Sequence, residues 1–306
     1  MSSVKTESNA NRVKGSPRDV AAGSNRVRSR VKGAVFKAIA VVVFAVMSFP
    51  VYWMINSSLL PTNKVRSDVP TFFPGSDFTL RNYQTAIFDD HRALFTPALE
   101  QSLRVTFFAL IGALIIAFLA SIAVGRFRFK GRKTFIVAIL IIQMIPGEAM
   151  MLTYFRMLDA WGLTEKILGL GLVYLASVLP FTIWTLRGFV TAVPAELEEA
   201  AMVDGLSRSG AFWRITFPLL APGLVSTGIF AFIQAWNEFT FALVIMQRPE
   251  NMTLPVWLRT FQQATRATDW GGLMAGSTLI AVPVLIFFLI VQGRMTGGLV
   301  SGAVKG

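Results

Sequence analysis

Long runs of apolar residues alternate with shorter polar segments from residue 34 onward. Each run is long enough to cross the hydrocarbon core of a bilayer, which takes about 20 helical residues. Several runs contain a proline, which a spanning helix tolerates where neighbouring helices or water satisfy the freed carbonyls. The pattern predicts a packed bundle of six transmembrane helices, near residues 34–55, 103–124, 135–154, 167–186, 223–246 and 273–292.

The distribution of Lys and Arg predicts how this bundle is oriented. If the N-terminus is cytoplasmic, the inside segments carry 18 Lys and Arg and the outside segments carry nine. The short loop GRFRFKGRK (125–133) is the clearest signal, because short basic loops stay on the cytoplasmic side. We therefore expect both termini in the cytoplasm. Segment 187–221, between the fourth and fifth helices, is then the longest cytoplasmic loop.

Composition supports a membrane protein and excludes several kinds of chemistry. Hydrophobic residues make up 54% of the 306 residues and charged residues only 15%, well below the roughly 25% usual in soluble domains. The chain has no cysteine, which excludes disulfides, thiolate nucleophiles and cysteine metal sites. Its single histidine, His91, lies in a polar loop, so we expect no metal site.

The first 33 residues differ in character from the rest of the chain. They carry eight Lys and Arg among Ser, Asn and Gly, with no apolar period. Such a composition predicts a disordered basic cytoplasmic tail at 1–33, ahead of a transmembrane domain at 34–306. The net charge of +12 then suits the anionic inner face of a membrane and does not require nucleic acid.

The loop at 187–221 contains the stretch EEAAMVDGLSRSGAFWRITFPLLAPG (198–223), which predicts a helix, a glycine turn and a second helix. Acidic residues at the start complement the positive end of a helix dipole. Gly205 can take the left-handed conformation that ends a helix, and Ser207 can cap the next one. We expect Pro218 to end that second helix. By composition alone, an amphipathic loop on the lipid surface fits equally well.

The order of residues in this loop resembles a known motif. Glu199-Ala200-Ala201, three residues, Gly205, nine residues and Ile215-x-Phe217-Pro218 resemble the EAA motif of bacterial ABC importer permeases, with Phe217 in place of the usual Leu. The basic loop at 125–133, the segment Trp236–Phe239 and the Gly-rich C-terminal end are similar to sugar-importer permeases of the MalG type. This resemblance covers nearly the whole chain after residue 34.

The resemblance implies an all-α permease subunit of the bacterial inner membrane, whose EAA loop forms a coupling helix on an ATPase. It implies as partners a second, MalF-like permease, an ATPase dimer and an extracytoplasmic solute-binding protein, besides membrane lipid. The residues expected to couple to the ATPase are Glu199, Ala200, Ala201, Asp204, Gly205, Ile215 and Pro218.

Nothing in the sequence points to catalysis by this chain. Gly never precedes Lys, so the phosphate-binding GxxxxGK[ST] loop is absent. With one His and no Cys, no Ser-His-Asp or metal-ligand set is available. We expect a non-enzymatic subunit without a cofactor of its own, with ATP and Mg bound by the partner ATPase.

Two acidic residues, Glu148 and Glu238, lie within predicted spans, and such residues are candidates for function. Along their helices they lie roughly 21 and 22 Å from the cytoplasmic ends. A translocation path could use their polar and aromatic neighbours as well. Alternatively, these groups hold helices or a partner subunit together, and in the resembling family the solute contacts can fall mainly on the partner permease. The path predicted here comprises Gln143, Glu148, Gln234, Trp236, Asn237 and Glu238.

The outside loops are 56–101 and 247–272. In the resembling family such loops meet the binding protein, which predicts a contact at the NMTLP segment; a plain turn is the alternative. The predicted contact residues are Asn251, Met252, Thr253, Leu254 and Pro255.

The function predicted from these features is uptake of a di- or oligosaccharide, with glycerol phosphate or an amino sugar as other possible solutes. An ion-gradient-driven secondary transporter or channel, with the two membrane acids as proton carriers, is the rival class. Inverted repeats would favour that rival, and none is visible. A membrane-bound enzyme is disfavoured because catalytic groups are missing.

Overall fold

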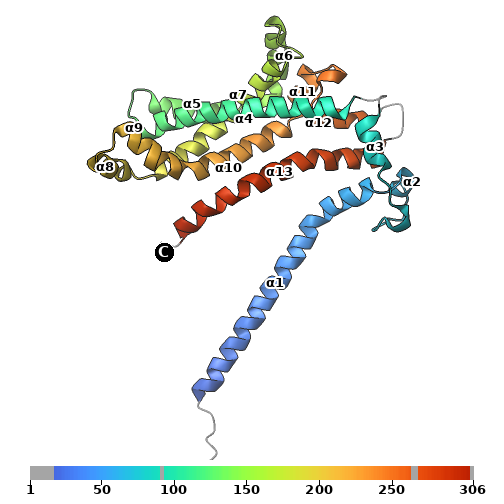
Figure 1. Cartoon of the computed structure of the whole chain (residues 1–306), viewed down its shortest axis with the longest axis horizontal. Coiled ribbons are helices and arrows are strands. Elements are labelled where there is room, and N and C mark those ends of the chain that lie inside the picture. The colour runs from blue at the N-terminus through green and yellow to red at the C-terminus, as the bar shows by residue number, and fades with distance from the viewer. Residues whose placement is uncertain (1–16, 90–92, 263–267, 304–306) are drawn as a thin grey trace, which may run out of the picture. The chain divides into compact units, whose positions relative to one another are not determined.

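The computed structural model describes residues 17–89, 93–262 and 268–303, which are helical or irregular and contain no strand (Figure 1). His91 and the first 16 residues of the predicted tail lie outside the described residues. The chain divides into two compact units, Met1–Trp53 and Met54–Gly306.

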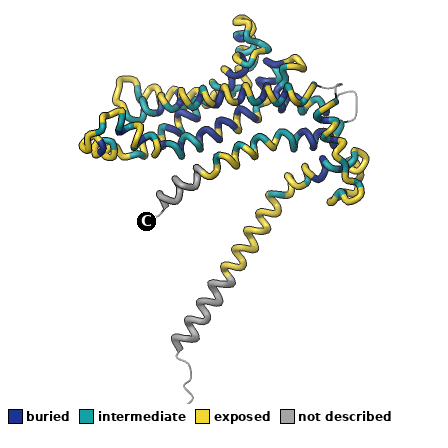
Figure 2. Tube along the Cα trace, in the orientation of Figure 1, coloured by how far each residue is buried: buried dark blue, intermediate teal, exposed yellow. Residues whose placement is uncertain are grey.

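The first unit consists of most of helix α1 (Pro17–Ser58). Residues 17–33, predicted to be disordered, are helical and continue the apolar helix toward the N-terminus. The physical reason is cooperativity, since extending an existing helix is far less costly than nucleating one. None of the apolar window of its span, Lys32–Ser58, is buried (Figure 2). Its apolar side chains therefore need lipid or protein to cover them.

The second unit is a bundle built on α4 (Phe95–Arg126), α7 (Ile167–Ala192), α10 (Phe217–Trp236) and α13 (Trp270–Ala303). The most extensive packing is between α4 and α7, while α10 contacts both of them and α13. Ala109, Ala113 and Ala117 are fully buried along one side of α4. This spacing of four residues places small side chains in a row, which lets the helix backbones approach closely.

The third predicted span is not one helix. Helix α5 (Arg132–Gln143) ends early, and the chain continues through the 3₁₀ turn η2 (Gly147–Met150) into α6 (Met151–Ala160), at a bend of 86° (Figure 1). Pro146 explains the interruption, because proline has no N–H to donate and disfavours helical geometry in the preceding residue. The described residues thus contain five helices long and apolar enough to span a membrane, or six if this bent pair counts as one span.

The fifth predicted span, 223–246, is interrupted too. Helix α10 ends at Trp236, and the short helix α11 (Thr240–Ile245) starts after an irregular stretch. The remaining elements lie in the connections: α2 (Thr62–Val65), η1 (Gly75–Asp77), α3 (Arg81–Phe88), α8 (Glu196–Val203), α9 (Arg208–Ala211), the π-helical turn η3 (Phe212–Thr216), η4 (Pro249–Asn251), α12 (Leu254–Leu258) and η5 (Arg259–Phe261).

Gly169 provides a test of the packing at the start of α7. A Cβ atom there would lie 2.1 Å from the carbonyl oxygen of Leu163, whereas a Cβ at Gly188 in the same helix would meet nothing within 4 Å. We expect Gly169→Ala to destabilise the protein by about 1–3 kcal/mol through overpacking. Gly188→Ala, the matched control, should be neutral or stabilising, by about 0.5–1 kcal/mol. Thermal unfolding in detergent measures both, and equal unfolding temperatures would contradict the packing described.

Candidate functional site

The loop between α7 and α10 forms the predicted helix, glycine turn and helix. Helix α8 is followed by Gly205, whose φ of 93° is left-handed, and the Ser207 side chain accepts a hydrogen bond of 3.1 Å from the Gly210 N–H. Both local predictions are confirmed. In Figure 1, α8 and α9 lie at the end of the bundle where α5 begins after the basic loop 125–133.

Pro218 does not end the second helix, contrary to the prediction. Helical structure continues from Arg208 through Trp236, with the π-helical turn η3 in between. The Phe217 N–H donates to the carbonyl of Phe212, five residues earlier. This wider turn lies just ahead of Pro218, where a proline in a regular α-helix would clash with the carbonyl four residues before it.

The predicted coupling residues fall into exposed and buried groups. Glu199, Ala200 and Asp204 are exposed on or next to α8, together with the apolar tip residue Val203, which is 87% exposed. Ala201 is buried, so its small side chain packs within this chain. Gly205 and Pro218 are exposed and Ile215 is half-buried.

Sequence reasoning missed how this loop is attached to the bundle. The Glu198 carboxylate forms an ion pair of 3.3 Å with Arg126 at the end of α4, and it accepts a hydrogen bond from the Thr216 hydroxyl in η3. The two charged side chains keep only 18% and 20% exposure. One carboxylate therefore joins α8, α4 and the start of α10. No local signal identifies a pair separated by 72 positions in the sequence.

The structure brings four of the predicted path residues to one cavity of about 530 Å³. It lies where α5 ends and η2 begins, against α6, α7 and the end of α10. Among the described residues, the side chains of Gln143, Glu148 and Gln234 form no hydrogen bond within the chain. Residues lining the cavity include Gln143, Glu148, Tyr154, Tyr174, Ser177, Phe181, Phe230, Gln234 and Glu238.

Glu238, the fourth predicted path residue at this cavity, also stabilises the local backbone. Its carboxylate oxygens accept hydrogen bonds from the backbone N–H groups of Phe241 (2.7 Å) and Ala242 (3.1 Å). The backbone carbonyl of Glu238 accepts a hydrogen bond of 3.3 Å from the Tyr174 hydroxyl. Glu238 therefore satisfies the first amides of α11, which would otherwise be unpaired at the interruption of the span.

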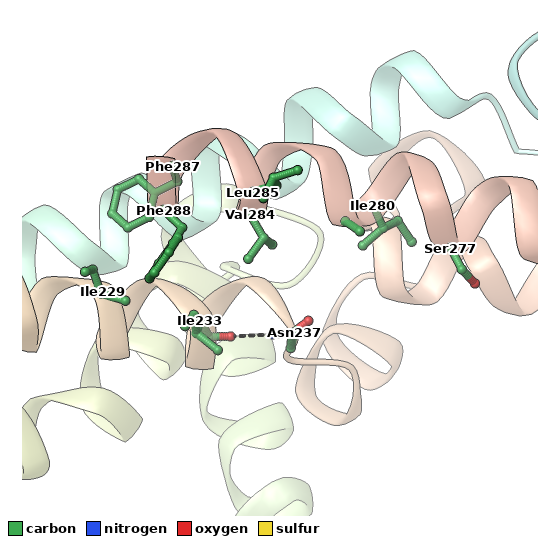
Figure 3. Close-up of a pocket in the computed structure, with 10 residues that line it drawn as sticks. Ile229, Ile233, Asn237, Ser277, Ile280, Val284, Leu285, Phe287 and Phe288 are labelled. Carbon is green, nitrogen blue, oxygen red and sulfur yellow. Dashed lines mark hydrogen bonds between the residues drawn. The ribbon is translucent and has the colours of Figure 1, made fainter. Parts of the chain in front are cut away.

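Trp236 and Asn237 lie away from this cavity. Trp236 is buried, stacks on Phe232 and donates its indole N–H to the Ile280 carbonyl of α13 at 3.3 Å. Asn237 lines a separate groove of about 470 Å³ between α10 and α13, which is apolar apart from Asn237 and Ser277 (Figure 3). Its side-chain amide donates to the Ile233 carbonyl of its own helix at 2.9 Å. The structure therefore does not bring these two residues together with the other four predicted path residues.

The NMTLP segment is not an exposed tip. Thr253 and Leu254 are buried, and the Leu254 N–H donates to the Ser102 hydroxyl of α4 at 2.7 Å. Leu254 and Trp257 lie three residues apart, so both can face the core from the short helix α12. Met252 and Pro255 are half-buried, whereas residues 247–250, just ahead of this segment, are exposed.

Glu165, another residue that sequence reasoning missed, holds this loop in place. It is the only described non-glycine residue with positive φ, at 59°. Its carboxylate accepts hydrogen bonds from the backbone N–H groups of Gln247 (2.8 Å) and Arg248 (3.2 Å) and from the Asn251 amide (3.0 Å). Asn251 is thus engaged within the chain. An ordinary Glu in a polar loop carries no sequence signal of this role.

Comparison with known proteins agrees with the resemblance seen in the sequence. Residues 113–296 match the family described as binding-protein-dependent transport system inner membrane component. The chain is 46% identical over 267 residues to the diacetylchitobiose uptake system permease protein DasC of Streptomyces coelicolor, covering 87% of this chain and 95% of that protein. It is 32% identical over 286 residues to the trehalose/maltose transport system permease protein MalG of Thermococcus litoralis, covering 92% and 100%.

A solved structure has the same fold. The chain is similar to one from the crystal structure of a bacterial ABC transporter involved in the import of the acidic polysaccharide alginate, with a TM-score of 0.71. The match covers 87% of this chain and 97% of that chain at 20% sequence identity.

The attachment of α8 can be tested with two neighbouring acids. Glu198→Ala should destabilise the protein by about 1–3 kcal/mol, because it leaves the half-buried Arg126 without its counter-charge. Glu199→Ala removes the same charge from an exposed position and should change stability by less than about 0.5 kcal/mol. Thermal unfolding of the purified chain in detergent distinguishes them, and a larger loss for Glu199→Ala would refute the assignment.

Proposed function

The chain belongs to the binding-protein-dependent transport system inner membrane component family, and we propose that it is the permease subunit of an ATP-driven importer for a di- or oligosaccharide. The observation that carries this proposal is that both interrupted spans, α5–η2–α6 and α10–α11, face one polar cavity. At membrane depth, irregular backbone is tolerated where it is buried in protein or lines a cavity.

The chemistry of this cavity suits a hydroxyl-rich solute. Gln143, Glu148 and Gln234 offer hydrogen-bond donors and acceptors that the chain itself leaves unused, and Tyr154 offers an aromatic face. The volume of about 530 Å³ falls within the roughly 300–1,000 Å³ of small-ligand sites. Relatives named for diacetylchitobiose and for trehalose and maltose support a disaccharide-sized substrate.

Coupling to a separate ATPase would use the exposed face of α8. Glu199 offers a carboxylate, Ala200 permits close approach, and Val203 provides an apolar tip. Binding of the ATPase in its closed form would then favour one of two conformations of the permease, through its different affinity for the two. ATP and Mg would be bound by that ATPase.

The structure suggests how a displacement of α8 would reach the cavity. Glu198 ties α8 to α4 and to η3, and the helix that begins at Arg208 runs on to Trp236 for 29 residues. At 1.5 Å per residue it is about 43 Å long, enough to cross the membrane. Its far end lies next to Glu238 at the cavity, so movement of the loop would shift the cavity wall directly.

The remaining partners follow from the same family. A second permease would complete the path, and a solute-binding protein would deliver the sugar at the end of the bundle opposite α8. There the exposed residues 247–250, held by Glu165, are a better candidate contact than the NMTLP segment, which is buried or half-buried. With its basic loop on the cytoplasmic side, the chain would be a multi-pass protein of the bacterial inner membrane.

Reversing a charge on α8 tests the coupling. Glu199→Arg should lower sugar uptake at least about tenfold while the protein still inserts in the membrane, since a charge-assisted contact is worth about 1.5–3 kcal/mol. Asp159→Arg, the same reversal at an exposed position of α6, is the control and should keep uptake near wild type. Uptake of radiolabelled sugar by cells with equal permease levels is the measurement. Normal uptake by Glu199→Arg would remove the coupling role.

The side-chain amides of Gln234 and Asn237 lie in two different sites, so replacing each in turn tests whether the polar cavity binds the sugar. Gln234→Ala removes a cavity side chain and should raise the half-saturating sugar concentration about five- to tenfold, the value of one hydrogen bond. Asn237→Ala removes an amide from the apolar groove and should leave this concentration unchanged. Uptake is measured over a range of sugar concentrations. The reverse pattern would place the path between α10 and α13 instead.

A further inference from the structure

A second groove lies on the outer surface of the bundle, at the end that carries the basic loop. It has a volume of about 690 Å³ and runs between the second half of α4 and the α9–η3 segment. Ile115 and Leu119 of α4 line it and are more than half exposed, and Trp213 of η3 faces it from the other side. None of the residues that line the polar cavity contributes to it.

One end of this groove is basic. Arg126 and Arg208 both line it, and the Arg208 guanidinium lies 6.0 Å from the centroid of the Phe127 ring. Arg132 donates to the Phe127 carbonyl at 3.5 Å, which brings a third guanidinium to the same end. Glu198 compensates for one of these charges through its ion pair with Arg126. The end of the groove therefore keeps a net positive charge.

Guanidinium groups such as those of Arg208 and Arg126 pair well with the oxygens of a phosphate. Arg208 is exposed, whereas the Arg126 side chain keeps only 18% exposure and its Nε and Nη2 atoms are buried without a hydrogen-bond partner among the described residues. Arg208 therefore offers the accessible hydrogen-bond donors, and Arg126 adds positive charge behind it. The basic end is suited to an anion.

The apolar part of the groove has the length of one leaflet. From Ile115 to Arg126, eleven residues of α4 rise about 16 Å, close to half of the roughly 30 Å hydrocarbon core. Trp213 lies near the basic end, and tryptophan favours the depth of lipid headgroups. An acyl chain along α4 would place its phosphate at the arginines.

We propose that this groove binds one anionic phospholipid of the leaflet next to the basic loop, which the Lys and Arg distribution makes the cytoplasmic leaflet. The acyl chain lies against Ile115 and Leu119, and the phosphate pairs with Arg208, with the charge of Arg126 behind it. A zwitterionic lipid fits less well, because its own ammonium group opposes the arginines. The lipid bridges α4 and α9 beside the Glu198 link. It thereby fixes the loop that carries α8.

Native mass spectrometry of the full chain in detergent, with phosphatidylglycerol or phosphatidylcholine added, tests this site. The wild-type chain should retain phosphatidylglycerol in preference to phosphatidylcholine. Arg208→Gln should lower that retention about fivefold, the effect of one basic residue near an anionic surface. Leu119→Trp fills the exposed apolar wall without changing charge and should lower retention as well. Arg214→Gln removes a charge from the same segment outside the groove and is the matched control.

Unchanged retention in both Arg208→Gln and Leu119→Trp would overturn the proposal, and so would an equal loss in Arg214→Gln, which would indicate unspecific attraction to charge. A photo-crosslinking amino acid at position 119 extends the test to the assembled importer in its native membrane. Crosslinks to lipid support the site. Crosslinks to a second protein chain would show that a partner helix covers the groove and would refute it. Because neither readout depends on sugar uptake, failure here leaves the proposed function untouched.

Discussion

Backbone N–H and C=O groups at membrane depth must find partners within the protein, because lipid tails offer none. This requirement governs the two places where spanning helices are interrupted. At the end of α10, Glu238 satisfies the amides of Phe241 and Ala242 and accepts, through its carbonyl, the Tyr174 hydroxyl. At the end of α5, Pro146 has no N–H to satisfy. The interruptions thus become stable, and the polar cavity lies between them.

The same requirement explains how one helix can connect the loop with the cavity. Pro218 would be expected to interrupt the backbone hydrogen bonds of the helix. The π-helical turn η3 accommodates it, and helical structure persists from Arg208 to Trp236. In the proposed coupling, a continuous helix of this length would transmit a displacement that an irregular loop would absorb. The ion pair between Glu198 and Arg126 adds a second connection, to α4.

Local chemistry was a reliable guide where neighbours in sequence decide the outcome. Gly205 and Ser207 act as predicted, because a left-handed turn and a helix cap depend on a few adjacent residues. Elsewhere the outcome depends on residues far away in the sequence. Trp236, predicted to line the solute path, packs against α13, and Leu254, predicted to contact the binding protein, packs against α4.

The order of residues along the chain is enough to identify an all-helical membrane protein of this family. The length and apolarity of a segment suffice to require a bilayer. The EAA-like order of residues is visible in the sequence and indicates the family. Which polar side chains share a cavity depends instead on how the helices pack, since Gln234 and Asn237 are three positions apart and yet lie in different sites. Gln234 lies within α10 and faces α7, whereas Asn237 follows the end of this helix at Trp236 and lies against α13, so packing between helices far apart in the sequence assigns the two amides to different sites.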